Sequence, residues 1–330
     1  MRIAYICESS GIFGGVRIVA EHLNRLTDRG HDCWYFPTEN DSIRWLPTRF
    51  NQAWIQAAPP LIGQCDVVVA TAGSTWPLVA ESPIFGKAKR MALCQMLEHL
   101  FHAPDSQNYK SLVKNLRLPL HFIVISQWLK AELKKFARRP VSVIRNGIDP
   151  ALFYPDPWEP HKGIRLLVEG HTLNQAKDIN EMTHWAIMAL KNSGYHFETW
   201  GFSQTAPRWE FDQYWVMPDQ DTIRHLYSSC DILVKASRYE GRPGPDLEAM
   251  ACGCAVNRAI LTGDDDLTDG VNCLKVKYGD LEQFTRNLQR LMVDDDLRRT
   301  LIENGKTYVR EHADWQTAID LLETALKGEA

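Results

Sequence analysis

Short apolar runs alternate with amphipathic segments along the first part of the chain. Residues 3–7 have the continuous apolar character of a buried strand. In residues 16–29 apolar side chains recur at helical spacing, and the pattern stops at Gly30. Strands that alternate with helices predict a parallel sheet covered on both faces. The other elements predicted in this part are strands at 33–36, 67–71, 91–94, 122–125 and 141–144 and a helix at 127–136 that Ser126 caps.

A proline-rich passage between residues 150 and 160 interrupts this alternation and predicts a linker. The alternation restarts at residue 164, and the last third of the chain is predicted to be helical. The sequence therefore predicts two α/β units. The elements predicted after the linker are strands at 164–169, 197–200, 232–235 and 255–260 and helices at 180–191, 222–229, 246–251, 281–291, 296–310 and 315–326.

Composition narrows the class of protein. The 330 residues are enough for two domains of roughly 150 each. The hydrophobic fraction of 45% and the charged fraction of 24% are ordinary for a soluble globular protein. The net charge of −4 lacks the basic excess of a nucleic-acid binder, so we expect no nucleic-acid partner. A net charge hides local basic patches, so association with a membrane surface stays open.

The cysteines and the first residues bear on localisation. The eight cysteines show no zinc-site spacing, and Cys252 and Cys254 are interpreted as packing residues at a helix end. Free thiols fit a reducing compartment. The chain starts directly in a strand pattern, without the apolar region of a signal peptide or the roughly 18 apolar residues of a membrane span. We expect a cytoplasmic protein, with attachment to the inner face of a membrane as an open variant.

The loop after the first predicted strand is rich in glycine. Gly11, Gly14 and Gly15 let the backbone approach an anion closely, and the following helix contributes a partial positive charge. Their G-x-x-G-G spacing differs from the dinucleotide fingerprint G-x-G-x-x-G. The loop therefore fits phosphate contact and a plain tight turn equally well.

Two carboxylates flank the start of another predicted helix. Glu240 lies in the loop after the strand at 232–235, and Glu248 is expected in the first helical turn, with Gly244 as N-cap and Pro245 as the first residue. Carboxylates accept hydrogen bonds from hydroxyl groups, so the pair suits a sugar or a ribose. The alternative is that Glu248 complements the helix dipole and Glu240 is solvated.

The stretch E-G-R-P-G-P-D-L-E-A-M-A-C-G-C-A-V, at residues 240–256, resembles the E-x7-E signature of family 4 glycosyltransferases. The resemblance covers essentially the whole chain and implies the GT-B fold, in which two Rossmann-like, doubly wound α/β domains face a cleft. It implies an acceptor-side domain at 1–155, a donor-side domain at 156–311, and a C-terminal helix, about 312–330, that crosses back to the first. The further blocks that agree, in order, are 141–153, 226–241, 271–284 and 312–323.

This resemblance implies a metal-independent, retaining transfer of a hexosyl or deoxyhexosyl group. The donor is a nucleotide diphosphate sugar, which serves as substrate, and no cofactor is expected. The acceptor hydroxyl belongs to a sugar, a lipid-linked or a small-molecule acceptor in the biosynthesis of a bacterial glycan, polysaccharide or glycosylated metabolite. Base recognition is expected through loop backbone near residues 215–218. The base, the sugar, the acceptor and the oligomeric state stay open.

The family pattern also implies roles for individual residues. Glu240 binds hydroxyls of the donor sugar, and Glu248 binds those of the ribose. Lys177 matches a family lysine that neutralises the leaving diphosphate, whereas His171 stands where the family has an arginine and acts there when protonated or as an N–H donor. The residues whose backbone is expected to meet the diphosphate are Gly241, Arg242 and Gly244 and, in the first domain, Gly14, Gly15 and Val16.

The segment between Glu240 and Glu248 also departs from the family pattern. Pro243 and Pro245 lack N–H donors and Asp246 would repel phosphate, so we expect the diphosphate to depend more on Lys177, Arg242 and the glycines of the first domain.

In the first domain, Gln95 replaces a family histidine. The Q-x-x-E pattern that it forms with Glu98 resembles some rhamnosyltransferases. Glu98 is therefore a catalytic candidate, and Gln95 and His99 are acceptor-side candidates. For His99 the alternative is an ordinary residue of an amphipathic helix.

The acidic run at 264–266 is interpreted as a solvated turn rather than a metal-binding D-x-D, and no metal is expected. Three rival functions stay open at this point. They are a glycosidase, because paired carboxylates also hydrolyse glycosidic bonds, a nucleotide-sugar epimerase on the same fold, and a non-catalytic nucleotide-sugar-binding module.

Overall fold

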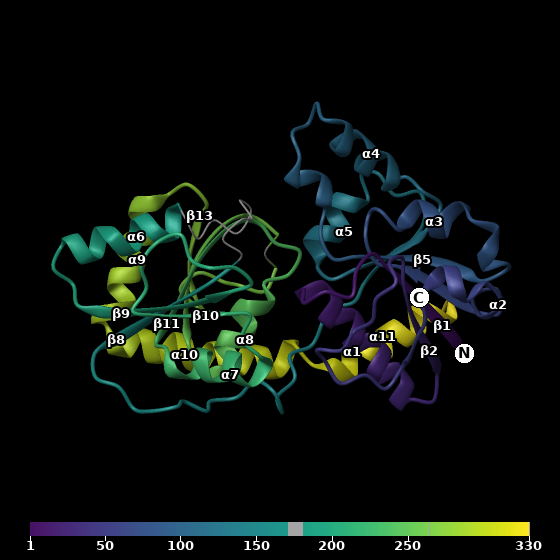
Figure 1. The fold of residues 1–330 in the computed structure, drawn as a ribbon. Coiled ribbons are helices and arrows are strands. Elements are labelled where there is room, and N and C mark those ends of the chain that lie inside the picture. Colours follow the sequence, from purple (N-terminus) through teal and green to yellow (C-terminus); the bar gives the residue numbers. More distant parts are fainter. Residues whose placement is uncertain (171–180, 264, 330) are drawn as a thin grey trace. The chain divides into compact units, whose positions relative to one another are not determined.

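The computed structural model describes residues 1–170, 181–263 and 265–329. The chain divides into two compact units, each built around one parallel sheet (Figure 1). Unit 1 comprises Met1–Asn146 and Gln316–Ala330, and unit 2 comprises Gly147–Trp315. The division thus follows Asn146 rather than residue 155.

Unit 1 contains a seven-stranded parallel sheet in the order β3-β2-β1-β4-β5-β6-β7. The strand order reverses between β1 and β4, and ligands of such sheets bind beyond the carboxyl ends of the strands at this switch point. The strands are β1 (Arg2–Cys7), β2 (Asp32–Pro37), β3 (Asn51–Gln52), β4 (Val67–Ala70), β5 (Lys89–Cys94), β6 (His121–Val124) and β7 (Val141–Val143).

Unit 2 contains a six-stranded parallel sheet in the order β10-β9-β8-β11-β12-β13, so its switch point lies between β8 and β11. The doubly wound α/β architecture expected from the sequence is confirmed in both units. The strands are β8 (Ile164–Glu169), β9 (Phe197–Ser203), β10 (Gln213–Val216), β11 (Ile232–Tyr239), β12 (Ala255–Thr262) and β13 (Leu274–Lys277).

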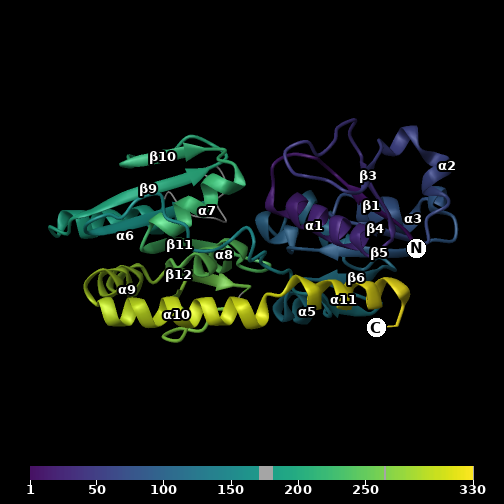
Figure 2. The same cartoon turned by 90° about the horizontal axis from the view of Figure 1, so that it is seen from below.

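The described helices cover the sheets of the two units (Figures 1 and 2). None of them is long and apolar enough to cross a membrane. In unit 1 they are α1 (Gly14–Asp28), η1 (Ile55–Ala57), α2 (Pro59–Ile62), α3 (Trp76–Glu81), η2 (Pro83–Phe85), η3 (Glu98–Phe101), α4 (Gln107–Asn115) and α5 (Gln127–Leu133). In unit 2 they are α6 (Met182–Asn192), α7 (Gln220–Ser229), α8 (Gly244–Cys252), α9 (Leu281–Val293) and α10 (Asp295–His312), and α11 (Trp315–Lys327) follows.

The strands of unit 2 bury side chains on both faces, because successive residues of a strand point to opposite sides. On β11, Ile232 and Val234 pack into the core shared with α6 and α9, whereas Leu233 packs into the core shared with α8. On β12, Val256 likewise faces α8. Cys252 and Cys254 lie in that same core, which confirms their interpretation as packing residues.

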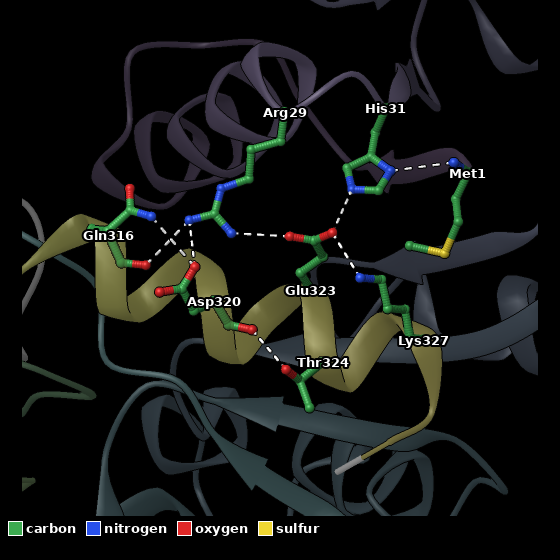
Figure 3. A network of polar contacts seen from close by, with 8 residues as sticks. All are labelled: Met1, Arg29, His31, Gln316, Asp320, Glu323, Thr324 and Lys327. Atoms are coloured by element: carbon green, nitrogen blue, oxygen red, sulfur yellow. Dashed lines mark hydrogen bonds and ion pairs between the residues drawn. The ribbon is translucent and has the colours of Figure 1, made fainter.

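Helix α11 is held in unit 1 by an apolar face and by two carboxylates, Asp320 and Glu323, which both pair with Arg29. Ile319, Leu322 and Leu326 are buried. On the polar side, Glu323 accepts hydrogen bonds from Arg29 at 3.0 Å and Lys327 at 2.9 Å, and it lies 3.2 Å from a ring nitrogen of His31 (Figure 3). The C-terminal helix therefore packs beside the end of α1 and the start of β2.

We predict that Glu323→Gln loosens this attachment in a pH-dependent way. Hydrogen bonds from Lys327 and Arg29 lower the pKa of Glu323 from 4.5 to about 2. A lowered pKa stabilises the fold above the ordinary value and loses this effect as the pH falls toward the folded value. The variant should melt about 2–4 °C below wild type at pH 7, and the difference should disappear between pH 5 and pH 2.

The measurement is thermal unfolding at a series of pH values. Glu303→Gln is the matched control, because Glu303 is an exposed helical residue that, among the described residues, pairs only with the nearby Lys306. It should melt like wild type throughout. A Glu323→Gln difference that stays constant down to pH 2 would contradict the assignment.

Candidate functional site

The carboxyl edge of the unit 2 sheet brings acidic residues together at the switch point. Glu169 is the last residue of β8, and Glu240 directly follows β11. These two strands are neighbours in the sheet and end at the same edge. A ligand bound at this edge would meet both loops and the start of α8, which begins after them.

The backbone of Glu240 is fixed by a close contact with the loop after β12. Its N–H donates to the carbonyl of Thr262 at 3.3 Å. Gly263 has a φ of +96°, and a Cβ on it would lie 1.6 Å from the carbonyl oxygen of Glu240. Only glycine permits this approach, so Gly263 sets where Glu240 stands.

The side chain of Glu240 points into unit 2 rather than into solvent. The residue is 5% exposed. Its Oε1 accepts a hydrogen bond from the hydroxyl of Ser237 at 3.0 Å and lies 3.4 Å from Nη2 of Arg258. The alternative that Glu240 is merely solvated is therefore wrong.

Glu240 belongs to a set of five buried or half-buried charges, which we call the buried charge cluster: Glu169, Lys235, Glu240, Asp246 and Arg258. Lys235 forms an ion pair with Glu169, and Nη1 of Arg258 donates to both oxygens of Asp246 at 3.0 and 2.9 Å. Burial alone would lower the pKa of Lys235, but Glu169, Glu240 and Asp246 raise it above its ordinary value. Burial raises the pKa of the Asp246 carboxyl, and Arg258 opposes that rise.

This arrangement corrects the expectation that Asp246 would repel a phosphate. Its side chain is fully buried, and its charge is compensated by Arg258. The start of α8 also differs from the prediction. The helix begins at Gly244 with Pro243 at the N-cap position, and the N–H of Gly244 donates to the carbonyl of Arg242. This bond speaks against the predicted diphosphate contact by Gly244.

Glu248 lies one residue further along α8 than expected. As the fifth residue of the helix, it follows the first turn, and it is only 4% exposed. A carboxylate that merely complemented the helix dipole would stand in the first turn and contact water. Its burial does not fit that role, and the predicted ribose contact stays a prediction.

The side chain of Arg242 binds Asp266. Its Nε and Nη2 each donate to one carboxylate oxygen at 3.1 Å, and both side chains are buried. Tyr308 donates to the same carboxylate at 2.8 Å. The expectation of a solvated turn is therefore wrong for Asp266, which neutralises part of the Arg242 charge. The Nη1 atom of Arg242 is buried and has no hydrogen-bond partner among the described residues.

Three predicted positions fall outside the part of the chain that the structure describes. They are His171 and Lys177, the expected cationic pair, and Asp264 of the acidic run. Within the described ranges, no three His, Cys, Asp or Glu side chains are arranged to hold a metal ion.

Unit 1 has a pocket of about 300 Å³ at its own switch point. Gly15 and Val16 of the predicted glycine loop line it, together with Gln95, which follows β5. The structure thus brings Gly15 and Val16, predicted to meet the donor diphosphate, to the same pocket as Gln95, predicted on the acceptor side, while Gly14 starts α1 beside them. The full lining is Cys7, Glu8, Ser9, Phe13, Gly15, Val16, Val19, Thr71, Ala72 and Gln95.

Two glycines bring polar side chains against the backbone near this pocket. Nε2 of Gln95 donates to the carbonyl of Gly15 at 3.1 Å, and a Cβ on Gly15 would lie 3.2 Å from that nitrogen. Glu98 accepts the N–H of Gly73 at 3.0 Å. Burial raises the pKa of Glu98, and the hydrogen bond from Gly73 opposes the rise.

His99 does not accompany Gln95 and Glu98. Its side chain is 5% exposed, and its ring contacts those of Tyr109 and Phe136 at centroid distances of 5.2 and 6.1 Å. Burial lowers its pKa, and the charge of Glu132 opposes this change. This packing speaks against the predicted acceptor contact by His99.

A family model described as "Glycosyl transferases group 1" matches residues 157–294, which lie within unit 2. Over this range, unit 2 resembles the group 1 glycosyl transferases. The matched range contains Glu240, Glu248 and the whole buried charge cluster.

The curated relatives match only part of this chain. An uncharacterised glycosyltransferase of Methanocaldococcus jannaschii is 23% identical over 216 residues, which cover 60% of this chain and 56% of the relative. The lipopolysaccharide core biosynthesis glycosyltransferase LpsE of Rhizobium meliloti is 33% identical over 87 residues, or 26% of each chain. The matches thus span about half or less of these relatives.

Solved structures resemble the chain over almost its full length. Sucrose-phosphate synthase from Thermosynechococcus elongatus has a TM-score of 0.77 at 15% identity and covers 100% of this chain, with 99% of its own chain matched. HepE of Anabaena, solved in complex with UDP-glucose, has a TM-score of 0.77 at 16% identity, with 99% and 100% covered. The lipopolysaccharide glycosyltransferase WaaG gives 0.77 at 14% identity, with the same coverage. These likenesses show that the chain has the GT-B fold.

We predict that Gly263→Ala destabilises unit 2 severely. The new methyl group would overlap the backbone of Glu240, which has no flexible atom to move away. The matched control is Gly270→Ala, because Gly270 also has a positive φ, of +70°, but nothing within 4 Å of its Cβ position. Chemical denaturation should show a loss of about 1 kcal/mol for Gly270→Ala and at least about 3 kcal/mol for Gly263→Ala. Equal losses would mean that the contact with Glu240 is not the constraint.

Proposed function

We propose that this chain is a retaining glycosyltransferase that moves a sugar from a nucleotide diphosphate donor to an acceptor hydroxyl. The observation that carries the proposal is the buried carboxylate pair, Glu240 and Glu248, around the start of α8. It lies at the ligand-binding edge of a domain that matches the group 1 glycosyl transferases. The lipopolysaccharide relatives favour a role in glycan biosynthesis.

A nucleotide sugar is the donor in this proposal. The similar HepE was solved with UDP and with UDP-glucose, which supports a nucleotide-sugar ligand on the same fold. Glu240 would accept hydrogen bonds from the sugar hydroxyls and Glu248 from the ribose. The backbone N–H groups of Gly241 and Arg242 and the side chain of Lys177 remain the predicted diphosphate contacts, with Gly14, Gly15, Val16 and His171 as further candidates.

The reaction that we propose proceeds on one face of the sugar. The bond between the anomeric carbon and the diphosphate oxygen breaks, and the acceptor oxygen forms its bond from the same side, so the configuration is retained. The acceptor proton passes to an oxygen of the leaving diphosphate. Negative charge develops on that diphosphate, where cationic and N–H groups lower the barrier. No metal and no cofactor takes part in this scheme.

The pocket of unit 1 is the proposed acceptor side. Its polar groups include Gln95, and Glu98 lies close by on η3 with a raised pKa. A carboxylate and an amide suit hydroxyl groups of a sugar or a sugar-like acceptor. The backbone contacts with Gly15 and Gly73 hold these two side chains in one orientation before a ligand binds.

We predict that Glu240→Gln and Glu248→Gln affect different parts of donor recognition, the sugar and the nucleotide respectively. Glu240→Gln should reduce transfer at least about a hundredfold while it preserves the affinity for the free nucleoside diphosphate. Glu248→Gln should weaken that affinity about tenfold. A thermal-shift screen of UDP-, GDP-, dTDP- and ADP-sugars first identifies the donor, because a ligand of the folded state raises the melting temperature.

Turnover is then measured with and without acceptors, and calorimetry gives the nucleotide affinities. Glu198→Gln is the control, because Glu198 lies near the start of β9 and pairs with Arg165 away from the site. Unchanged transfer by Glu240→Gln would overturn its role. Release of free sugar, formation of an epimer without acceptor, or binding without turnover would favour the hydrolase, the epimerase or the binding module instead.

We also propose that unit 1 associates with an anionic membrane surface. Between residues 107 and 139 the only acidic residue is Glu132. The ring contacts of His99 with Tyr109 on α4 and with Phe136 after α5 hold the two basic segments against η3. The exposed basic residues of these segments are Lys110, Lys114, Arg117, Lys134, Lys135, Arg138 and Arg139.

We predict that the triple variant Lys114→Glu/Arg117→Glu/Lys134→Glu loses binding to vesicles that contain phosphatidylglycerol. Each basic residue near such a surface contributes about 1 kcal/mol, so the loss should reach at least about tenfold. Wild type should sediment with these vesicles at low salt and not with purely zwitterionic ones. A second triple variant, Arg299→Glu/Lys306→Glu/Arg310→Glu on α10, is the charge-matched control. Equal losses for both variants would contradict the proposed surface.

A further inference from the structure

Two buried cations lie side by side in the sheet of unit 2. Lys235 of β11 and Arg258 of β12 are direct register partners, and both side chains are fully buried. They lie on the same strand faces as Leu233 and Val256, toward α8. Like charges in this arrangement repel each other, and each ion loses its hydration. Such a pair persists only with compensating carboxylates.

Three carboxylates supply this compensation, each from a different segment. Glu169 ends β8 and pairs with Lys235, Asp246 lies in the first turn of α8 and pairs with Arg258, and Glu240 stands in the loop between β11 and α8. The cluster therefore links the strands at the switch point to the helix that carries Glu248.

Arg258 is the member that connects two of these carboxylates. Its Nη1 binds both oxygens of Asp246, and its Nη2 lies 3.4 Å from Oε1 of Glu240. The planar guanidinium holds these nitrogens at a fixed separation. With Asp246 holding Arg258, the second nitrogen lies at an ion-pair distance of 3.4 Å from the Glu240 carboxylate.

Stability alone does not account for this arrangement. Buried ion pairs are often no more stable than apolar residues of the same volume. The same unit contains another partly buried pair, Arg165 and Glu198, but there the carboxylate side chain is 49% exposed. That pair lies near the amino ends of β8 and β9. The fully buried Arg258 and Asp246 instead stand beneath the ligand-binding edge.

We propose that Arg258 is a positioning residue for donor-sugar recognition, which holds the Glu240 carboxylate in its binding orientation with Asp246 as its anchor. The inference rests on the proposed function, because it concerns the group that binds the donor sugar. The hydroxyl of Ser237 also contacts Oε1 of Glu240, to which it donates a hydrogen bond at 3.0 Å. Arg258 acts only through Glu240 and need not touch the ligand.

The test compares nucleoside diphosphates with the corresponding nucleotide sugars. Calorimetry gives dissociation constants for UDP and UDP-glucose, GDP and GDP-mannose, and dTDP and dTDP-glucose. The ratio within each pair measures what the sugar adds to binding. In Arg258→Met/Asp246→Leu, which replaces the ion pair by apolar side chains of similar size, this contribution should fall about tenfold, while the affinity for the nucleoside diphosphate and the melting temperature stay close to wild type.

Three further variants keep the inference testable if the double variant does not fold. Ser237→Ala removes only the hydroxyl hydrogen bond to Oε1 and should reduce the sugar contribution about threefold. Arg258→Lys keeps a charge but cannot reach both carboxylates, so it should fall between wild type and the double variant. Arg165→Met is the control for loss of a buried arginine and should reduce stability without changing the ratio.

The outcomes separate this inference from the proposed function. If wild type binds none of the nucleotides, the proposed function fails and the inference fails with it. If wild type gains affinity from the sugar and both Arg258→Met/Asp246→Leu and Ser237→Ala keep that gain, the positioning role is overturned and the proposed function stands. If the gain falls in these variants and persists in Arg165→Met, Arg258 has the proposed role.

Discussion

The burial of Lys235 beside Arg258 is the constraint on which the site of unit 2 depends. Two neighbouring cations without water require carboxylates, and the structure draws these from β8, from the loop after β11 and from α8. The strands at the switch point and the helix that follows them are thereby held together by charge as well as by apolar packing. The segments that form the carboxyl edge of the sheet also supply the carboxylates that compensate the buried cations. A change in the edge therefore alters the charge compensation, and the reverse.

Two sets of contacts hold Glu240, one on its backbone and one on its carboxylate. Gly263 fixes its backbone through a contact that leaves no room for a side chain. Ser237 and Arg258 fix its carboxylate. A group held in this way loses little conformational freedom when a ligand binds, so more of the interaction energy appears as affinity. Glu240 is thus only 5% exposed and is held in one orientation without any ligand.

The sequence predicted the alternating architecture and the carboxylates of α8, because periodicity and local motifs depend on residues close together in the chain. It missed α4, which buries no residue, and the short strands β10 and β13. It also misread Asp246 and Asp266, whose partners Arg258 and Arg242 lie 12 and 24 positions away. One signal was present: Lys235 interrupts the apolar run of β11, and a charge at such a position requires a partner.

The polar side chains of the two units are held in place by different kinds of partner. In unit 1, Gln95 and Glu98 bind backbone atoms of Gly15 and Gly73, and a neutral donor or acceptor opposes each of them. In unit 2, Glu240 is opposed by a full positive charge. Burial raises the pKa of Glu98, and the N–H of Gly73 opposes only part of that rise, whereas the charge of Glu240 is compensated directly by a neighbouring cation.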